Sequence, residues 1–117
     1  MNLEELEKIC KKLPGVTQDV KWGNDLCFSV GNKMFLVAAL DQKPTTASFK
    51  VGDDQFDEMA ARPGFKPAPY MAKHKRIWLE DINLMGKNEW AQVIEQSYEL
   101  VKQKLPKKIQ EQLRRDL

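Results

Sequence analysis

The sequence predicts an α+β protein in which helices pack on one face of an antiparallel β-sheet. Three observations support this fold class. Apolar residues recur at three- and four-residue spacing near both ends of the chain, and short segments rich in β-branched and aromatic residues lie between them. Turns containing glycine or proline separate these segments. The length of 117 residues and the hydrophobic share of 42% suit one core, so we expect a single domain over residues 1–117.

The first expected element is an amphipathic helix at the N-terminus. Its apolar residues are Leu3, Leu6, Ile9, Cys10 and Leu13. Asn2 and Glu5 have the spacing of a helix cap and its reciprocal partner, and the helix should end before Pro14-Gly15.

Strands are expected next, over residues 16–20, 26–30 and 33–40. Gly31-Asn32 connects the last two segments, and both residue types accept a positive φ at little cost, so this connection predicts a tight hairpin. Residues 46–51 resume the strand pattern after a polar loop that contains Pro44.

A short helix should follow, capped by Asp53 or Asp54 and continuing through Ala61. Residues 65–72 contain two prolines and predict an extended, partly irregular crossing, and residues 77–79 predict a short strand.

Helical periodicity returns over residues 87–104, which form the second long helix. Pro106 is placed to begin a further helix, whose apolar stripe is Ile109, Leu113 and Leu117.

Several classes of protein do not fit the composition. The longest apolar run covers residues 34–40, which is far short of the roughly 20 residues of a membrane-spanning helix. The acidic N-terminus lacks the features of a secretory signal or transit peptide, so we expect a cytoplasmic protein. Cys10 and Cys27 are expected to be buried, reduced thiols.

No catalytic, metal or cofactor site is expected. The single histidine, His74, lies in the cationic run 73–76, without a nucleophile and acid in a recognisable pattern. The acidic clusters at residues 4–7 and 53–58 suit helix N-termini, where carboxylates are favoured by the helix dipole. Iron or calcium binding on an acidic helix remains an alternative, although no ligand loop of known spacing is present.

Basic and aromatic residues indicate nucleic-acid binding. Residues 1–61 carry seven basic and ten acidic side chains, whereas residues 62–117 carry twelve and seven. The stretch 62–79 has five Lys or Arg residues, no acid, and the aromatic residues Phe65, Tyr70 and Trp78. Cations neutralise phosphates and aromatic rings stack on bases, although the same composition also fits solvated lysines around core aromatics.

A set of short motifs in a fixed order resembles the YjbR (MmcQ) family over nearly the whole chain. The motifs are Leu-Pro-Gly at 13–15, Lys-Trp-Gly at 21–23, Gly-Asn-Lys-Met-Phe at 31–35, Ser-Phe-Lys at 48–50, Pro-Ala-Pro-Tyr-Met-Ala-Lys at 67–73, Trp78, Ser-Tyr at 97–98 and Lys-Leu-Pro at 104–106. The resemblance implies a frataxin-like or secretion-chaperone-like α+β fold in the bacterial cytoplasm. It also implies a DNA-binding role with a double-wing arrangement, and no catalytic residues.

We therefore expect loops near Lys43 and residues 73–76 to contact the phosphates of double-stranded DNA as two wings. The candidate DNA-binding residues are Lys43, Arg62, Lys66, Lys73, His74, Lys75 and Arg76.

Two other hypotheses remain. The first is a protein-interaction module or homodimer that uses the open side of the sheet or the stripe of Ile109, Leu113 and Leu117. The second is a ligand-binding protein or enzyme with Trp22 and Trp78 in a pocket.

Overall fold

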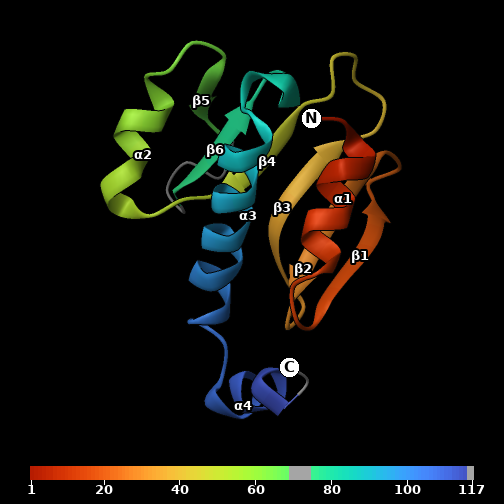
Figure 1. Cartoon of the computed structure of the whole chain (residues 1–117), viewed down its shortest axis with the longest axis vertical. Helices are drawn as coiled ribbons and strands as arrows, with labels where there is room; N and C mark the ends of the chain where they lie inside the picture. Colours follow the sequence, from red (N-terminus) through yellow and green to blue (C-terminus); the bar gives the residue numbers. More distant parts are fainter. Residues whose placement is uncertain (69–74, 116–117) are drawn as a thin grey trace.

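The computed structural model describes residues 1–68 and 75–115, in which the expected α+β fold is confirmed (Figure 1). The elements in chain order are α1 (Leu3–Lys11), β1 (Val16–Lys21), β2 (Asp25–Val30), β3 (Lys33–Ala39), β4 (Ala47–Lys50), α2 (Asp53–Ala60), β5 (Phe65–Pro67), β6 (Arg76–Leu79), the 3₁₀ helix η2 (Ile82–Leu84), α3 (Lys87–Lys102) and α4 (Lys107–Arg115).

The six strands form one antiparallel sheet in the order β1-β2-β3-β4-β6-β5. The first four strands are neighbours in sequence order, and β6 lies between β4 and β5. The register of β4 and β6 places Ser48 opposite Trp78 and Lys50 opposite Arg76. Side chains alternate between the two faces of a strand, so these four side chains share one face.

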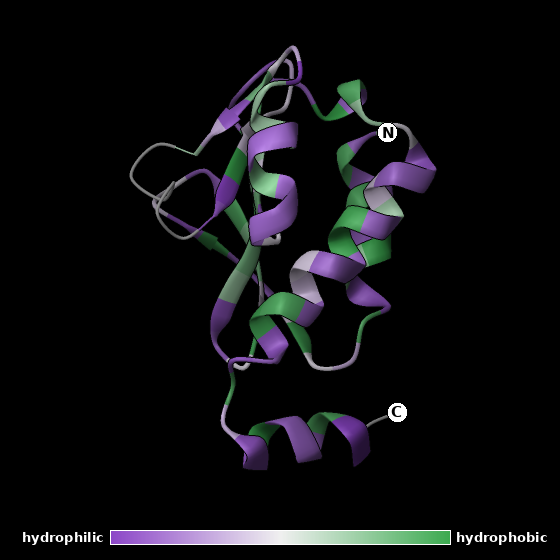
Figure 2. Cartoon of the chain, turned by 90° about the vertical axis from the view of Figure 1, so that its left-hand side faces the viewer, coloured by the Kyte–Doolittle hydropathy of each residue, from purple (hydrophilic) through white to green (hydrophobic). Residues whose placement is uncertain are grey.

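Helices α1 and α3 cover the other face of the sheet (Figures 1 and 2). The core between them contains two edge-to-face aromatic pairs: the ring centroids of Phe35 and Tyr98 are 5.8 Å apart, and those of Phe49 and Trp90 are 5.6 Å apart. All four rings are buried, and the indole N–H of Trp90 donates a hydrogen bond to the carbonyl of Ile82 at 2.7 Å. This pairing fixes α3 across β3 and β4.

Local signals predicted most of the element boundaries. The Asn2 side chain accepts a hydrogen bond from the backbone N–H of Glu5, as expected of an N-cap. Gly31 and Asn32 both have positive φ, at 54° and 65°, which confirms the tight turn between β2 and β3.

One prediction about the middle of the chain is wrong. The N-cap of α2 is Gly52, and neither Asp53 nor Asp54 caps it, because both already belong to its first turn. Their carboxylates are still favoured there by the helix dipole. The extended crossing predicted over 65–72 begins with the strand β5, where Pro67 is tolerated because β5 is an edge strand, and its part at 69–72 lies outside the described residues.

Helix α4 packs against its own chain. Leu113 is buried, Ile109 is partly buried against the core, and Leu117 lies outside the described residues. Figure 2 shows the hydrophobic residues of α4 on the side that faces the rest of the molecule. The apolar stripe is therefore covered, over its described part, without a second protein. None of the described helices is long and apolar enough to span a membrane.

Candidate functional site

A cavity of about 490 Å³ opens between the sheet and the segment that joins α3 to α4. Among the described residues that line it, five have cationic side chains and none has a carboxylate; we call it the cationic cavity. Its lining residues are Lys21, Asn32, Lys33, Met34, Lys50, Arg76, Val101, Lys104 and Leu105.

Three parts of the fold bring these residues together. The β2–β3 turn places Asn32, Lys33 and Met34 at one wall, and the β4–β6 register places Lys50 beside Arg76. The third wall is the end of α3 and the segment after it. Close packing holds that segment to the turn, because a Cβ on Gly31 would lie only 2.7 Å from a methyl carbon of Leu105.

Arg76 is the most constrained cation of the cavity. Its Nη2 reaches across β4 and donates a 2.6 Å hydrogen bond to the carbonyl oxygen of Met34. Its Nε is buried and has no hydrogen-bond partner among the residues that the structure describes. Burial lowers the pKa of this guanidinium, which nevertheless stays charged at neutral pH. The cavity therefore holds a fixed positive charge.

The pKa of Lys50 is affected by the other cations of the cavity. Its pKa is lowered, first by burial and then by the positive charges of Lys104 and Arg76, while the carboxylate of Asp53 acts in the opposite direction. The strand that carries Lys50 is held to α3, because the hydroxyl of Ser97 donates to the Lys50 carbonyl. Like charges that lie close together disfavour the charged form, so the lowered pKa reflects repulsion between the cations of the cavity.

Among the predicted DNA-binding residues, Arg62 is already paired within the protein. Its guanidinium donates two hydrogen bonds to the carboxylate of Glu89, at 2.9 and 3.0 Å, and lies 4.3 Å from the centre of the Phe65 ring. The pKa of Arg62 is raised, mainly by the hydrogen bond to Glu89. This arrangement joins α3 to the segment between α2 and β5.

Two of the predicted lysines lie over aromatic rings. The ammonium of Lys66 is 4.5 Å from the centre of the Trp78 ring, and that of Lys75 is 4.9 Å from the centre of the Phe56 ring. Both are cation–π contacts. Lys75 and Arg76 are neighbours in sequence, yet only Arg76 lines the cationic cavity.

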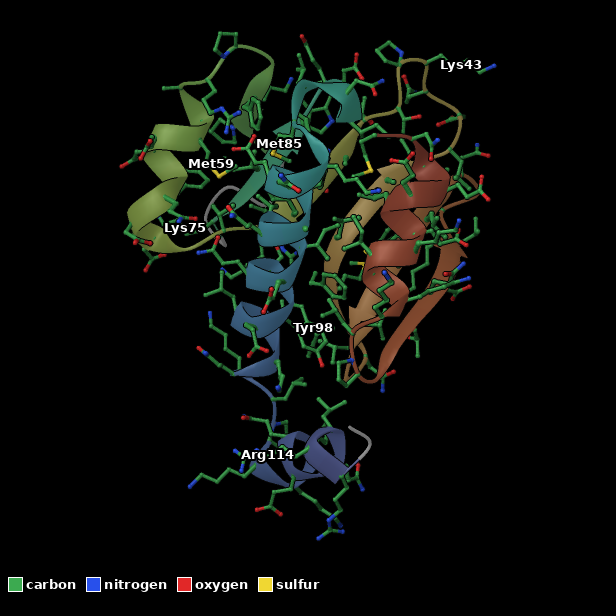
Figure 3. All side chains as sticks on the ribbon, in the orientation of Figure 1. Lys43, Met59, Lys75, Met85, Tyr98 and Arg114 are labelled. Carbon is green, nitrogen blue, oxygen red and sulfur yellow. The ribbon has the colours of Figure 1, made fainter. Side chains whose placement is uncertain are left out.

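Lys43 is not among the residues that line the cationic cavity. Figure 3 shows Lys43 on a loop at the top right of the view and Lys75 on the opposite side, near α2. Lys73 and His74 lie outside the described residues. The two expected wings are therefore not seen together, and the assignment of these residues to DNA stays a prediction.

Four cavity cations were missed as candidates: Lys21, Lys33, Lys50 and Lys104. The signal of Lys21, Lys33 and Lys50 is weak because each stands alone in its segment, whereas Lys104 lies in a basic cluster near the C-terminus that could extend a nucleic-acid surface. All four belong to the motifs that carry the family resemblance, at 21–23, 31–35, 48–50 and 104–106, which is the signal that could have indicated them.

The tryptophans do not form a shared pocket. Trp78 lines a second cavity of about 410 Å³, together with Asp25 and Asp41, and Trp22 is not among the residues that line it. Trp22 is 71% exposed and has a positive φ of 52° in the β1–β2 turn.

Metal binding and thiol chemistry have few candidate side chains in this protein. Within residues 1–68 and 75–115, no three His, Cys, Asp or Glu side chains are grouped so that they could hold a metal ion. Cys10 and Cys27 are free and buried, as expected, and burial together with the charge of Glu7 raises the pKa of Cys10 to about 12. A thiol with such a pKa is a poor nucleophile at neutral pH.

Comparison with known proteins identifies the family of this chain. The YjbR family model matches residues 11–100. The fold is similar to the crystal structure of Deinococcus radiodurans protein DR2400, which has a DUF419 domain, with a TM-score of 0.85 and 22% identity over 96% of this chain and 87% of that one. A Pseudomonas syringae protein has a TM-score of 0.71 and 20% identity over 86% of this chain and 99% of that one. None of the curated proteins matches this chain. Since the family model covers well over half of its residues, this chain belongs to the YjbR family.

Proposed function

We propose that this protein binds double-stranded DNA without catalysing a reaction, and that the cationic cavity is the centre of the binding surface. The observation that supports this function best is the cavity itself, whose lining, over the part of the chain that the structure describes, has five cationic side chains and no carboxylate. Phosphates supply the negative charge that this arrangement lacks.

The internal pairing of the other cations favours the cavity over the predicted wings. Arg62 is neutralised by Glu89, whereas none of the described carboxylates lines the site that contains Arg76, Lys104 and Lys33. Lys33 and Lys104 are exposed at its rim, where they can reach a phosphate with little desolvation. Affinity should therefore be mainly electrostatic and sequence-independent.

A salt-dependent titration tests this function. A short mixed-sequence duplex is titrated with the protein between about 50 and 200 mM salt, and the logarithm of the association constant should fall linearly with the logarithm of the salt concentration. The variant Lys104→Gln should reduce the slope by about one, because one phosphate contact is lost. The matched control is Lys8→Gln, which removes an exposed lysine of α1 and should leave the slope unchanged. Absence of binding at the lowest salt concentration would contradict the proposal.

A second candidate function is protein interaction, and the exposed Trp22 favours it. Val20 is 50% exposed and Leu40 is 40% exposed, and the Leu40 N–H is hydrogen-bonded to the carbonyl of Asn24 in the same turn as Trp22. Large exposed apolar side chains on connected segments are typical of contact surfaces. Sedimentation of the wild type and of Trp22→Ser tests this function. A concentration-dependent dimer that the substitution abolishes is expected, and a monomer at all concentrations would contradict it.

A further inference from the structure

The cationic cavity is concave and has two kinds of lining. Lys33, Lys50, Arg76 and Lys104 provide positive charge, whereas Met34, Val101 and Leu105 provide apolar surface. Its volume of about 490 Å³ lies within the range of roughly 300–1,000 Å³ that is usual for small-molecule sites. The cavity is therefore large enough for a phosphate together with part of the group that carries it.

Two kinds of phosphate occur in DNA. A phosphate inside a strand is esterified on both sides and has two free oxygens. A terminal phosphate has a single ester bond and projects beyond its sugar with three free oxygens. Inside the cavity, a terminal phosphate can present all three to the cations while its sugar lies against Val101 and Leu105.

The charge of the cavity favours the same group. A phosphodiester carries one negative charge, whereas a phosphomonoester carries about −1.5 to −2 at pH 7 and has three acceptor oxygens. The lysine ammoniums each have three donors on a flexible chain, while Arg76 is held in place by its hydrogen bond to Met34. A doubly charged anion compensates such a cluster better than a singly charged one.

We infer that the cationic cavity is a binding site for a phosphomonoester. This inference rests on the proposed function, because it assigns the terminal phosphate of a nucleic acid to the same cavity. A free nucleotide has the same chemistry, so the experiment must distinguish a DNA end from a small molecule.

Two duplexes of identical sequence provide the first test, one with 5′-phosphate ends and the other with 5′-hydroxyl ends. We expect the phosphorylated duplex to bind at least about tenfold more tightly, which corresponds to about 1.4 kcal/mol. This preference should be lost in Lys104→Gln and retained in Lys8→Gln. Both positions are exposed, and thermal unfolding of each variant verifies that it is folded.

A nucleoside monophosphate provides the second test, by amide NMR titration of the full chain. Shifts at Asn32, Lys33 and Lys104 that saturate, and that are absent in Lys104→Gln, are expected for binding in the cavity. The corresponding nucleoside without phosphate should cause no such shifts.

The outcomes separate the two proposals. Equal affinity for the two duplexes would overturn this inference and leave DNA binding intact. If neither duplex binds but the monophosphate produces saturating shifts at the cavity, the phosphomonoester site stands with a small molecule as its ligand, and the proposed function fails. If the monophosphate produces no shift and the duplexes do not bind, both fail.

Discussion

Arg62 lies in an acid-free basic stretch of the sequence, yet a carboxylate 27 residues further along the chain neutralises it. The two hydrogen bonds between Arg62 and Glu89 are bidentate, the geometry in which a partly exposed ion pair is most effective. A residue that looks available for DNA in the sequence therefore has a structural partner.

The pair gives stability a pH dependence. The hydrogen bond from Arg62 lowers the pKa of Glu89 below that of an unfolded glutamate, about 4.3. The pair should thus stabilise the fold above that pH, and its contribution should be lost as the pH falls through the lowered pKa. We expect Glu89→Gln to reduce the free energy of unfolding by about 0.5–1 kcal/mol at pH 7 and to approach wild type in acid. Urea unfolding over a pH series measures this, with Glu95→Gln, an exposed position of the same helix, as the control.

The lowered pKa of Lys50 offers a second test at this scale. After burial, the charge of Lys104 is the largest cause of that lowering. We therefore expect Lys104→Gln to raise the pKa of Lys50, measured by NMR titration of its side-chain methylene signals. The same substitution at Lys8 should not move this pKa. If the pKa of Lys50 is unchanged in Lys104→Gln, the charge of Lys104 does not act on Lys50.

At the scale of the elements, α4 is held to the protein by few contacts. Leu113 lies against Gly15, where an added Cβ would be 2.1 Å from a methyl carbon of Leu113. The side-chain amide of Gln110 donates to two carbonyls. One belongs to Gln103, which caps the C-terminus of α3, and the other to Leu105, in the linker between α3 and α4. The position of α4 therefore sets the position of Leu105, which lines the cationic cavity.

Removing the Leu113 side chain should release α4. We expect Leu113→Ala to lower the free energy of unfolding by about 2–3 kcal/mol, because a buried leucine is replaced by a smaller side chain. Amide hydrogen exchange in 107–115 should become faster than in α3. Leu40→Ala, at a position that is 40% exposed, should cost clearly less. Equal losses would mean that α4 contributes little to the fold.

At the scale of the whole molecule, the net charge is only +2, although positive charge is in excess at the cationic cavity. Five cations from both halves of the chain line one cavity, while many acids lie elsewhere on the surface. Local potential, and not net charge, is therefore what an anionic ligand encounters.

Acid should weaken the preference for phosphorylated ends. The second pKa of a phosphomonoester is about 6, so the terminal phosphate loses its second negative charge as the pH falls through this value. We expect the affinity ratio of 5′-phosphorylated to 5′-hydroxyl duplex to fall between pH 7.5 and pH 5.5. The ratio cancels effects of pH that are common to both duplexes. A ratio independent of pH would show that the second charge is not recognised.

The elements of the fold were predictable because their signals are local. Helical periodicity defined α1 and α3, and Gly31-Asn32 defined the β2–β3 turn, since positive φ at both residues favours these types. The strand β5 was less clear, because its three residues are paired only through β6 and end at a proline. Short edge strands depend on their neighbour more than on their own sequence.

The sequence by itself determined the α+β class, most elements and the family of this protein. Only the tertiary structure decided which cations gather. Lys33, Lys50, Arg76 and Lys104 lie on separate elements, and the sheet register and the docking of α3 bring them to one cavity. The same folding paired Arg62 with Glu89. Periodicity reports which face of an element is apolar, whereas the electrostatic field of a site depends on distances between residues that are far apart in the chain.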